Sequence, residues 1–350
     1  MNFVGHASKL LLLGLAVALL SPGWCVQLAA APNQLRAEAI NKAEPSGKTR
    51  RTLSPAVIAR AQILLDRAKF SPGEIDAKEG ENFKKAISAF AEAYGLPSKA
   101  GLTKEIWLKL VQIGPQPAVI EYQITEDDVK GPFLPELPPK MEDLKDLPAV
   151  SYTSAAEALA EKFHMSEELL RKLNAQSSFD KAGETIVVPN ILTNGAPLAA
   201  SRVEIAKTAQ TVRAFDAQNN IIAFYPATVG SNEKPSPSGT LKVTGIYPNP
   251  YYRYNPKYRF KGVSATKPFE IKPGPNNPVG DMWIGLSAEG YGIHGTPYPA
   301  KVNKAESHGC VRLTNWDAED LSRTVTKGTP VIFVEGPGEP SNTREGKRER

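Results

Sequence analysis

Hydrophobic residues recur at helical spacing in three stretches between residues 54 and 112. Residues three and four apart share one face of a helix, so this spacing predicts a small three-helix module with an apolar interior. Ser54 and Thr103 stand at N-cap positions before the first and third stretches, and Gly95 stands at a C-cap position after the second. The capping residues therefore divide the module at the same points as the hydrophobic pattern.

The pattern changes at residue 113. Residues 113–150 are rich in proline, which is typical of a semi-rigid linker. Residues 151–191 contain two short helical stretches, the first of which begins at Ser154, and then the strand-like run Glu184–Pro189. This combination predicts a small α+β unit.

From residue 198 to residue 335 the chain consists of short runs rich in β-branched and aromatic residues, separated by turn residues. A single helical stretch, Trp316–Val325, interrupts them, with Thr314 as its candidate N-cap. The segment therefore predicts a mostly-β domain, a sandwich or barrel with one helix, in a multidomain chain. Residues 336–350 are charged and polar and are expected to form a disordered tail.

The first 53 residues predict an exported protein. Lys9 precedes an apolar run of eleven residues, Leu10–Leu20, and small residues follow at Ala29–Ala31. This order is typical of a secretory signal peptide, here residues 1–30, and the run is too short to span a bilayer. A buried core helix is the alternative. Residues 31–53 are polar and of mixed charge, which predicts a disordered leader; the mature protein is expected in the periplasm or at the cell wall, without a membrane span.

The net charge of +5 is small, and basic residues do not alternate with stacking aromatics in the manner of nucleic-acid binders. Removal of the signal peptide also removes Cys25 and leaves Cys310 as the only cysteine of the mature chain. A single thiol cannot form an internal disulfide in an oxidising compartment. Cys310 is therefore either a buried inert residue or a reactive one.

The surroundings of Cys310 favour a reactive thiol. His294 and His308 lie within sixteen residues of it, and a nearby imidazole activates a thiol as a nucleophile. Gly309 allows the backbone to approach a substrate carbonyl closely, so that main-chain N–H groups can bind the oxyanion. Zinc binding is the competing interpretation, but the motif contains no carboxylate and lacks the spacing of structural zinc sites. We therefore expect no metal and no cofactor.

The same residues carry a resemblance to a known family. The motif His294-Gly295-Thr296, followed by Ser307-His308-Gly309-Cys310-Val311-Arg312, resembles the signature of the YkuD-type L,D-transpeptidase catalytic domain. The resemblance extends over roughly residues 200–335. Arg312 stands where many members of the family have Asn.

The two upstream segments resemble cell-wall-binding modules. Residues 54–112 resemble the peptidoglycan-binding-domain-1 family in runs such as Ser71–Asp76, with Ala77 where that family usually has Gly. Residues 151–191 resemble a degenerate LysM module, a βααβ fold, in runs such as Ala158–Phe163. A small helical spacer with its own core is the alternative for the second segment.

The catalytic-domain resemblance implies a two-step acyl transfer on peptidoglycan. Cys310 attacks the carbonyl between the third residue of a stem tetrapeptide and its terminal D-Ala. D-Ala leaves, and an amine of a second stem converts the thioester into a 3→3 cross-link. His294 acts as general base and acid; Gly295 has no side chain, so any third member that orients the imidazole there is a main-chain carbonyl. Gly295, Ser307 and Arg312 are the expected substrate-binding residues. His308 and Gly309 place the backbone of the oxyanion hole.

Two residues of the motif keep two interpretations each. Arg312 either anchors a substrate carboxylate in bidentate fashion or makes a structural ion pair. Ser307 either hydrogen-bonds near the nucleophile or holds the loop. The aromatic and basic stretch at 251–260 is either a lid over the substrate or a packed loop of the domain.

Three functions remain open at this point. The first is the transpeptidase, which serves cell-wall biogenesis and cell shape, with another stem, an outer-membrane lipoprotein or a free D-amino acid as acceptor. The second is a carboxypeptidase or other hydrolase with the same site, in which water takes the place of the acceptor. The third is a non-catalytic protein that binds the cell wall. The intact pair of His294 and Cys310 argues against the third, and peptidoglycan is the expected partner in all three.

Overall fold

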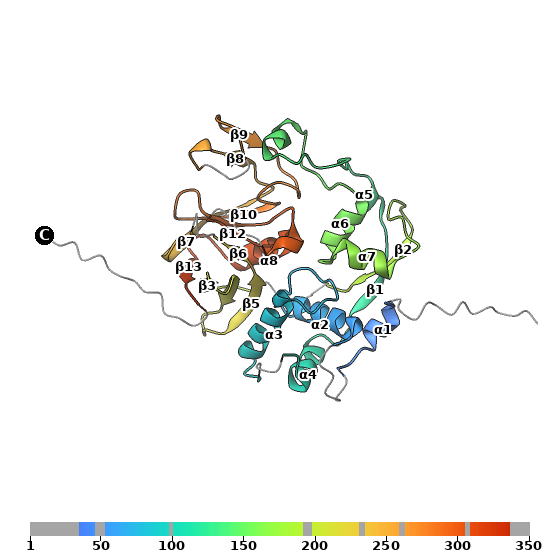
Figure 1. The fold of residues 1–350 in the computed structure, drawn as a ribbon. Helices are drawn as coiled ribbons and strands as arrows, with labels where there is room; N and C mark the ends of the chain where they lie inside the picture. Colours follow the sequence, from blue (N-terminus) through green and yellow to red (C-terminus); the bar gives the residue numbers. More distant parts are fainter. Residues whose placement is uncertain are drawn as a thin grey trace, which may run out of the picture. The chain divides into compact units, whose positions relative to one another are not determined.

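The structure of the protein is a computed structural model, and it describes residues 35–45, 53–97, 101–191, 198–230, 235–258, 263–304 and 309–336 (Figure 1). These residues belong to one compact unit. The expected signal peptide at residues 1–30 and the expected tail at residues 336–350, apart from residue 336, lie outside the described part. Within that part, no helix combines the length and the apolar character that crossing a bilayer requires.

Three helices pack around one apolar core where the hydrophobic pattern predicts them. They are α2 (Pro55–Arg67), α3 (Glu81–Ala93) and α4 (Lys104–Ile113). Ser54 Oγ accepts a hydrogen bond from Val57 N, and Thr103 Oγ1 accepts one from Ile106 N, both at 3.3 Å, which confirms the two predicted N-caps. Ala77, where the resemblance leads us to expect glycine, has a φ of 59°. That value lies in the left-handed region, which explains the preference for glycine there.

A helix occupies part of the segment that we expected to be a disordered leader. In α1 (Ala37–Asn41), Ile40 is fully buried in a cluster that also contains Val119. Asn41 exchanges two hydrogen bonds with the main chain of Val119, at 3.0 and 2.9 Å. The structure differs from the expectation because the partner that orders this short polar segment lies far along the chain, where local composition gives no sign of it.

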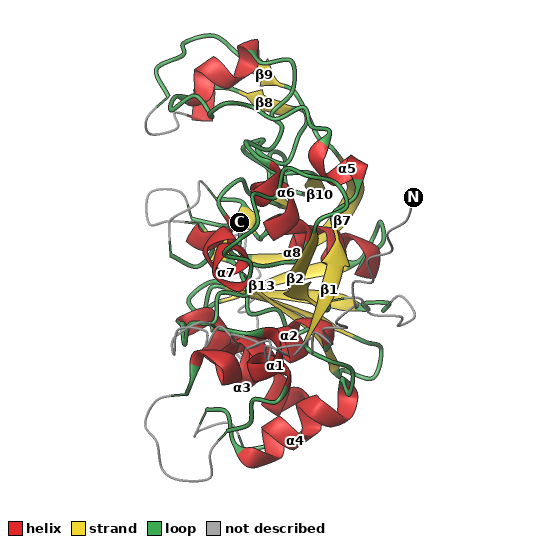
Figure 2. Cartoon of the chain, turned by 90° about the vertical axis from the view of Figure 1, so that its right-hand side faces the viewer, coloured by secondary structure: helices red, strands yellow, loops and turns green. Residues whose placement is uncertain are grey.

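The proline-rich segment contributes a strand to the second module. β1 (Val119–Gln123) pairs antiparallel with β2 (Thr185–Pro189), and Figure 2 shows the two side by side. Between them in the chain come four helices: α5 (Glu126–Val129), the 3-10 helix η1 (Met141–Asp146), α6 (Ala155–Lys162) and α7 (Glu167–Leu173). With α5 and η1 as an insertion, the order is βααβ. Residues 113–150 are therefore more than a linker, and the first strand escaped the sequence analysis because its partner is distant.

A single nine-stranded sheet forms most of the β domain, residues 198–335, in the described part of the chain. With its one α-helix, the domain confirms the expected mostly-β fold class. Its strands are β3 (Arg202–Ala206), β4 (Thr211–Phe215), β5 (Ile221–Pro226), β6 (Thr228–Val229), β7 (Gly239–Pro248), β10 (Met282–Leu286), β11 (Gly292–His294), β12 (Val311–Arg312) and β13 (Pro330–Val334). They lie in the order β5-β4-β3-β13-β7-β10-β11-β12-β6. Neighbours are antiparallel except in two pairs, β3–β13 and β11–β12.

The sheet is rolled so that its two edges come close together. β5 and β6 stand at opposite ends of the strand order, yet only Ala227 separates them in the chain. The side-chain amide of Gln210, just before β4, accepts from Val229 N at 2.7 Å and donates to Val229 O at 3.0 Å. These bonds link β6 to the other edge of the sheet. The apolar interior includes side chains of α8 (Asn315–Thr324), which packs against β10 and β11 (Figure 1).

The aromatic and basic stretch belongs to a second, two-stranded sheet. β8 (Tyr252–Tyr254) pairs antiparallel with β9 (Phe269–Ile271), and the 3-10 helix η2 (Pro256–Tyr258) follows β8. The ring of Tyr254 is buried and stacks on Phe269 with 4.7 Å between ring centroids. This packing favours the interpretation of the stretch as a packed loop of the domain. Tyr251, by contrast, is exposed.

The helical module and the β domain share a hydrophobic core. Phe224 of β5 is 1% exposed and lies in the apolar cluster of α2, α3 and α4. Its main chain is also held by the module, because Ser71 N donates to Phe224 O at 2.9 Å and Phe224 N donates to Lys69 O at 2.8 Å. Figure 1 shows α3 beside β5. One buried ring and two backbone hydrogen bonds therefore join the two parts.

Phe224→Ala is expected to destabilise both parts together. Truncation of a buried phenylalanine costs about 3–5 kcal/mol, which chemical denaturation would record as a lower free energy of unfolding. Tyr251→Ala is the control, because Tyr251 is 56% exposed and its truncation is expected to change stability by less than about 0.5 kcal/mol. If Phe224→Ala behaved like this control, the shared core would not hold the two parts together.

Candidate active site

Strand pairing places the predicted histidine and arginine in one row across the sheet. Trp283 of β10 stands opposite His294 of β11, and His294 stands opposite Arg312 of β12. Residues opposite each other in a sheet share a face, as do residues two apart in an extended segment. Cys310 directly precedes β12, two residues before Arg312, and the charge of Arg312 acts on both the Cys310 thiol and the His294 imidazole. Continuing the geometry of the strand pair to residue 310, with strands about 4.8 Å apart and a rise of about 3.3 Å per residue, gives about 8 Å between the Cα atoms of His294 and Cys310.

His294 is buried, and its ring is held on two sides. The indole of Trp283 stacks on the imidazole with 5.5 Å between centroids and 15° between planes. Nδ1 lies 2.7 Å from the carbonyl oxygen of Gly295. A carbonyl oxygen only accepts hydrogen bonds, so Nδ1 carries the proton and Nε2 keeps the free lone pair of a base. Burial, followed by the charge of Arg312, lowers the pKa of His294 to about 3, so the ring is neutral at neutral pH.

Cys310 follows a turn that only glycine forms easily. Gly309 has a φ of 99°, and its carbonyl oxygen accepts a hydrogen bond from Ser236 Oγ at 2.8 Å. The Cys310 Sγ lies 3.6 Å from the carbonyl oxygen of Gly290. Burial raises the pKa of the Cys310 thiol, while the main chain at Gly292 and the charge of Arg312 lower it. The thiol therefore needs a base at the moment of attack.

Arg312 lies beside the thiol without a carboxylate partner among the described residues. None of the ion pairs in that part of the chain includes Arg312, and its Nε is buried without a hydrogen-bond partner there. The groups that interact with its charge are Cys310, Tyr252 and Tyr298. A structural ion pair, the second interpretation of this residue, is absent from the described part. Burial also raises the pKa of Tyr252, so its hydroxyl stays protonated as a hydrogen-bond donor.

The structure places five of the predicted site residues together: His294, Gly295, Gly309, Cys310 and Arg312. The other two, Ser307 and His308, lie outside the described residues. Two neighbours of the site, Trp283 and Asn315, were not predicted from the sequence, whereas Tyr252 belongs to the aromatic and basic stretch that was. The cross-strand position of Trp283 depends on the register of β10 and β11, which their short sequences do not reveal locally. Within the described residues, no three side chains of His, Cys, Asp or Glu gather as a metal site.

The chain between His294 and Cys310 is held by the helical module. Asn82, at the start of α3, donates from Nδ2 to the carbonyl oxygen of Val302 at 3.2 Å and accepts from Asn303 Nδ2 at 2.8 Å. Lys85 Nζ donates to Asn303 Oδ1 at 2.9 Å. The helical module therefore holds Val302 and Asn303, within the connection from His294 to Cys310.

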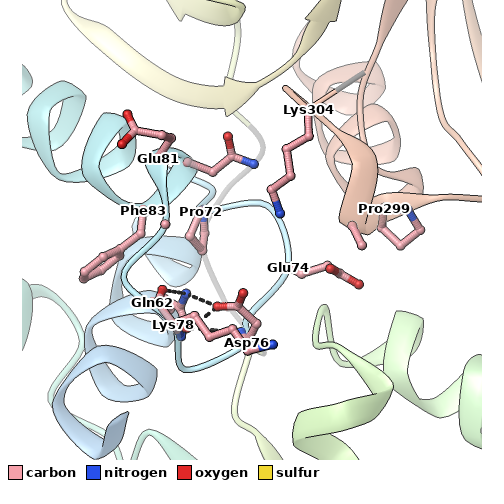
Figure 3. A pocket seen from close by; sticks show the side chains of 12 residues that line it. Gln62, Pro72, Glu74, Asp76, Lys78, Glu81, Phe83, Pro299 and Lys304 are labelled. Carbon is pink, nitrogen blue, oxygen red and sulfur yellow. Dashed lines mark hydrogen bonds between the residues drawn. The ribbon is translucent and has the colours of Figure 1, made fainter. Parts of the chain in front are cut away.

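A small charged pocket lies where this segment meets the module (Figure 3). Glu74 and Lys304 face it from its two sides, and the 3-10 helix η3 (Pro299–Lys301) contributes Pro299. Burial raises the pKa of Glu74 to about 7, and the nearby Asp76 adds to the effect. Neither His294 nor Cys310 lines this pocket, so the pocket is distinct from the candidate active site.

Comparisons with known proteins give a family for the β domain. Residues 200–333 match the YkuD family, described as the L,D-transpeptidase catalytic domain. A Bacillus licheniformis relative named L,D-transpeptidase YkuD is 27% identical over 180 residues, which cover 51% of this chain and 92% of the relative. A Bacillus subtilis relative named L,D-transpeptidase YqjB is 34% identical over 122 residues, which cover 33% of this chain and 62% of the relative.

Among solved structures, the NMR structure of the catalytic domain from the Enterococcus faecium L,D-transpeptidase is 19% identical, with a TM-score of 0.30; the match covers 40% of this chain and 100% of that one. The family match starts after the two upstream modules and spans the nine-stranded sheet from β3 to β13, including the pair of β11 and β12 that carries His294 and Arg312. Residues 200–333 therefore belong to the YkuD family of L,D-transpeptidase catalytic domains.

Proposed function

We propose that the protein is an exported, cysteine-dependent L,D-transpeptidase that acts on peptidoglycan stem tetrapeptides through a thioester on Cys310. The observation that carries the proposal is the pairing of β11 with β12. It brings a buried histidine with a free Nε2 across from the only cysteine outside the N-terminal region, inside a domain of the matching family. The proposal extends the family assignment to a nucleophile, a base and a substrate.

In the first step, the thiol attacks the carbonyl carbon between the third stem residue and the terminal D-Ala. His294 Nε2 takes the thiol proton while the C–S bond forms, and the carbonyl oxygen becomes an oxyanion. Main-chain N–H groups at Gly309 and Cys310 bind this oxygen, with His308 placing the backbone and Ser236 fixing the Gly309 peptide. The imidazolium then returns its proton to the nitrogen of D-Ala as the C–N bond breaks, which leaves the thioester.

In the second step, an amine on the diamino acid of another stem attacks the thioester carbonyl. Nε2 of His294 takes a proton from the attacking amine and delivers it to the departing sulfur of Cys310. The product is a 3→3 cross-link, and the thiol is regenerated. A lipoprotein amine or a free D-amino acid fits the same step as acceptor, because each supplies only a nucleophilic nitrogen.

Arg312 anchors a carboxylate of the stem peptide in this proposal. A buried guanidinium without a counter-charge is unfavourable, and a bound carboxylate supplies both the charge and the missing acceptor for Nε. Ser307 assists near the nucleophile, and the helical and LysM-like modules bind the wall. These roles, and export to the periplasm or the cell wall, are part of the same proposal.

Purified protein is expected to convert disaccharide-tetrapeptide into cross-linked dimer and free D-Ala, as seen by mass spectrometry of the products. Cys310→Ala is expected to lose both products. Tripeptide monomer as the sole product would support a carboxypeptidase instead of a transpeptidase. No D-Ala release by the unaltered protein would contradict both.

His294→Gln is expected to lower the rate of thioester formation about a thousandfold, a size typical of removing a catalytic acid or base. His308→Gln is expected to cost less, because its role is to place the oxyanion-hole backbone. Rates of D-Ala release under single-turnover conditions measure both. The assignment is reversed if His294→Gln keeps near-normal rates while His308→Gln loses about a thousandfold.

The pH dependence of thiol alkylation tests the charge state of the resting site. Because burial raises the pKa of Cys310 and depresses that of His294, the resting pair is neutral. The rate of alkylation by iodoacetamide is therefore expected to rise with pH through a midpoint above the usual range of a thiol. Arg312→Met is expected to move the midpoint upward, since it removes a charge that favours the thiolate, whereas Arg312→Lys retains the charge and shifts it less. A midpoint below neutral pH would instead indicate a thiolate–imidazolium pair.

A further inference from the structure

The peptide group between Gly295 and Thr296 is fixed at both ends. Its carbonyl oxygen, from Gly295, accepts the hydrogen bond from His294 Nδ1 at 2.7 Å. Its N–H, from Thr296, donates to the side-chain oxygen Oδ1 of Asn315 at 3.0 Å. A peptide group is planar, so a rotation that misdirects its carbonyl also breaks the bond to Asn315. The side chain of Asn315 therefore sets the plane that orients the imidazole.

Asn315 is itself held in a tight, polar slot. It is the first residue of α8, and Thr314 caps the helix by accepting from Asp317 N at 3.2 Å. A Cβ atom at Gly280 would come within 2.0 Å of Asn315 Oδ1, and one at Gly295 within 2.2 Å. The slot thus exists only because these two positions are glycine, and it leaves the carboxamide no room to turn.

The amide nitrogen of Asn315 is anchored by one acceptor from the LysM-like module and one from the β domain. Nδ2 donates to Glu161 Oε2 at 2.9 Å and to the carbonyl oxygen of Pro275 at 3.1 Å. Glu161 lies in α6 of the LysM-like module, 154 residues earlier in the chain, and is 9% exposed. Burial raises the pKa of Glu161 to about 8, an effect that the bond from Asn315 opposes. A glutamine at this position can accept the same hydrogen bond.

We propose that Asn315 and Glu161 are positioning residues for His294, so that the LysM-like module completes the active site instead of only binding the wall. The path runs from Glu161 to Asn315, through the Gly295–Thr296 peptide group, to Nδ1 of His294. This inference rests on the proposed role of His294 as the base. Loss of the path leaves Cys310 and the Arg312 anchor in place, so it lowers the rate of the chemical step without weakening substrate binding.

The α6 helix offers a matched control for the docking of the module. Glu157, one turn before Glu161, accepts from Asn276 Nδ2 of the β domain at 2.9 Å. It therefore also bridges the two parts, but it makes no direct bond to Asn315; its partner Asn276 only follows Pro275, whose carbonyl is the second acceptor of Asn315. A role in docking alone predicts equal effects of substitution at Glu157 and Glu161, whereas positioning of the imidazole predicts a loss of kcat at Glu161 and little effect at Glu157.

The kinetic test compares Glu161→Leu, Glu161→Gln and Glu157→Leu in the full mature chain, with disaccharide-tetrapeptide as substrate. Misplacement of a catalytic group by a fraction of an ångström is expected to lower kcat about tenfold in Glu161→Leu, with KM unchanged. Glu161→Gln keeps the acceptor and should stay within about twofold of the unaltered protein. Glu157→Leu should keep its kcat. Equal losses in Glu157→Leu and Glu161→Leu, or no loss in Glu161→Leu, would overturn the proposal.

A second readout does not need turnover. The imidazole nitrogen shifts of His294 in a long-range ¹H–¹⁵N spectrum are expected to show one neutral tautomer with the proton on Nδ1. Asn315→Leu and Glu161→Leu are expected to give a mixture of tautomers, while Glu157→Leu keeps the single one. If the unaltered protein shows this signature but releases no D-Ala, the proposed function fails and the positioning role stands. If all variants keep one tautomer, the positioning role fails even in an active enzyme.

Discussion

β11 and β12 pair in parallel over only two residues each, Ile293 with Val311 and His294 with Arg312. The arrangement of the candidate site depends on this short contact, because it sets Arg312 opposite His294 and begins at the residue that follows Cys310. So small a ladder is not stable by itself. The ladder is stabilised by the core of the rolled sheet, in which Ile293 and Val311 are buried. Leu313 N adds a further hydrogen bond to His294 O at 2.8 Å.

The upstream modules also take part in this support. α3 holds the segment between the histidine and the cysteine through Asn82, and α6 reaches Asn315 at the start of α8 through Glu161. Ser71, in the turn after α2, donates to the buried carboxylate of Asp317 at 3.0 Å, and burial raises the pKa of that carboxyl well above its usual range. The two upstream modules therefore make buried contacts with the β domain, and the described residues of all three belong to one compact unit.

Local sequence patterns predicted the elements whose signals are local. The helices of residues 54–112, the caps at Ser54 and Thr103 and the β-rich domain all follow from spacing and capping chemistry within a few residues. The motif around Cys310 supplied the candidate residues of the site, though not their arrangement. What was missed depends on distant partners: β1 needs β2, α1 needs Val119, and Trp283 acquires its place from register. Asn315 was overlooked because an asparagine at a helix start is ordinary until its partners are known.

The mass of the acyl-enzyme tests the central claim most directly. Mature protein would be mixed with disaccharide-tetrapeptide whose diamino-acid side-chain amine is acetylated, so that the substrate cannot act as acceptor, then quenched in acid and measured intact and after proteolysis. The proposed mechanism predicts an added mass equal to this substrate minus D-Ala, located on the peptide that contains Cys310 and absent from Cys310→Ala. An adduct on another residue, or undiminished D-Ala release by Cys310→Ala, would contradict it.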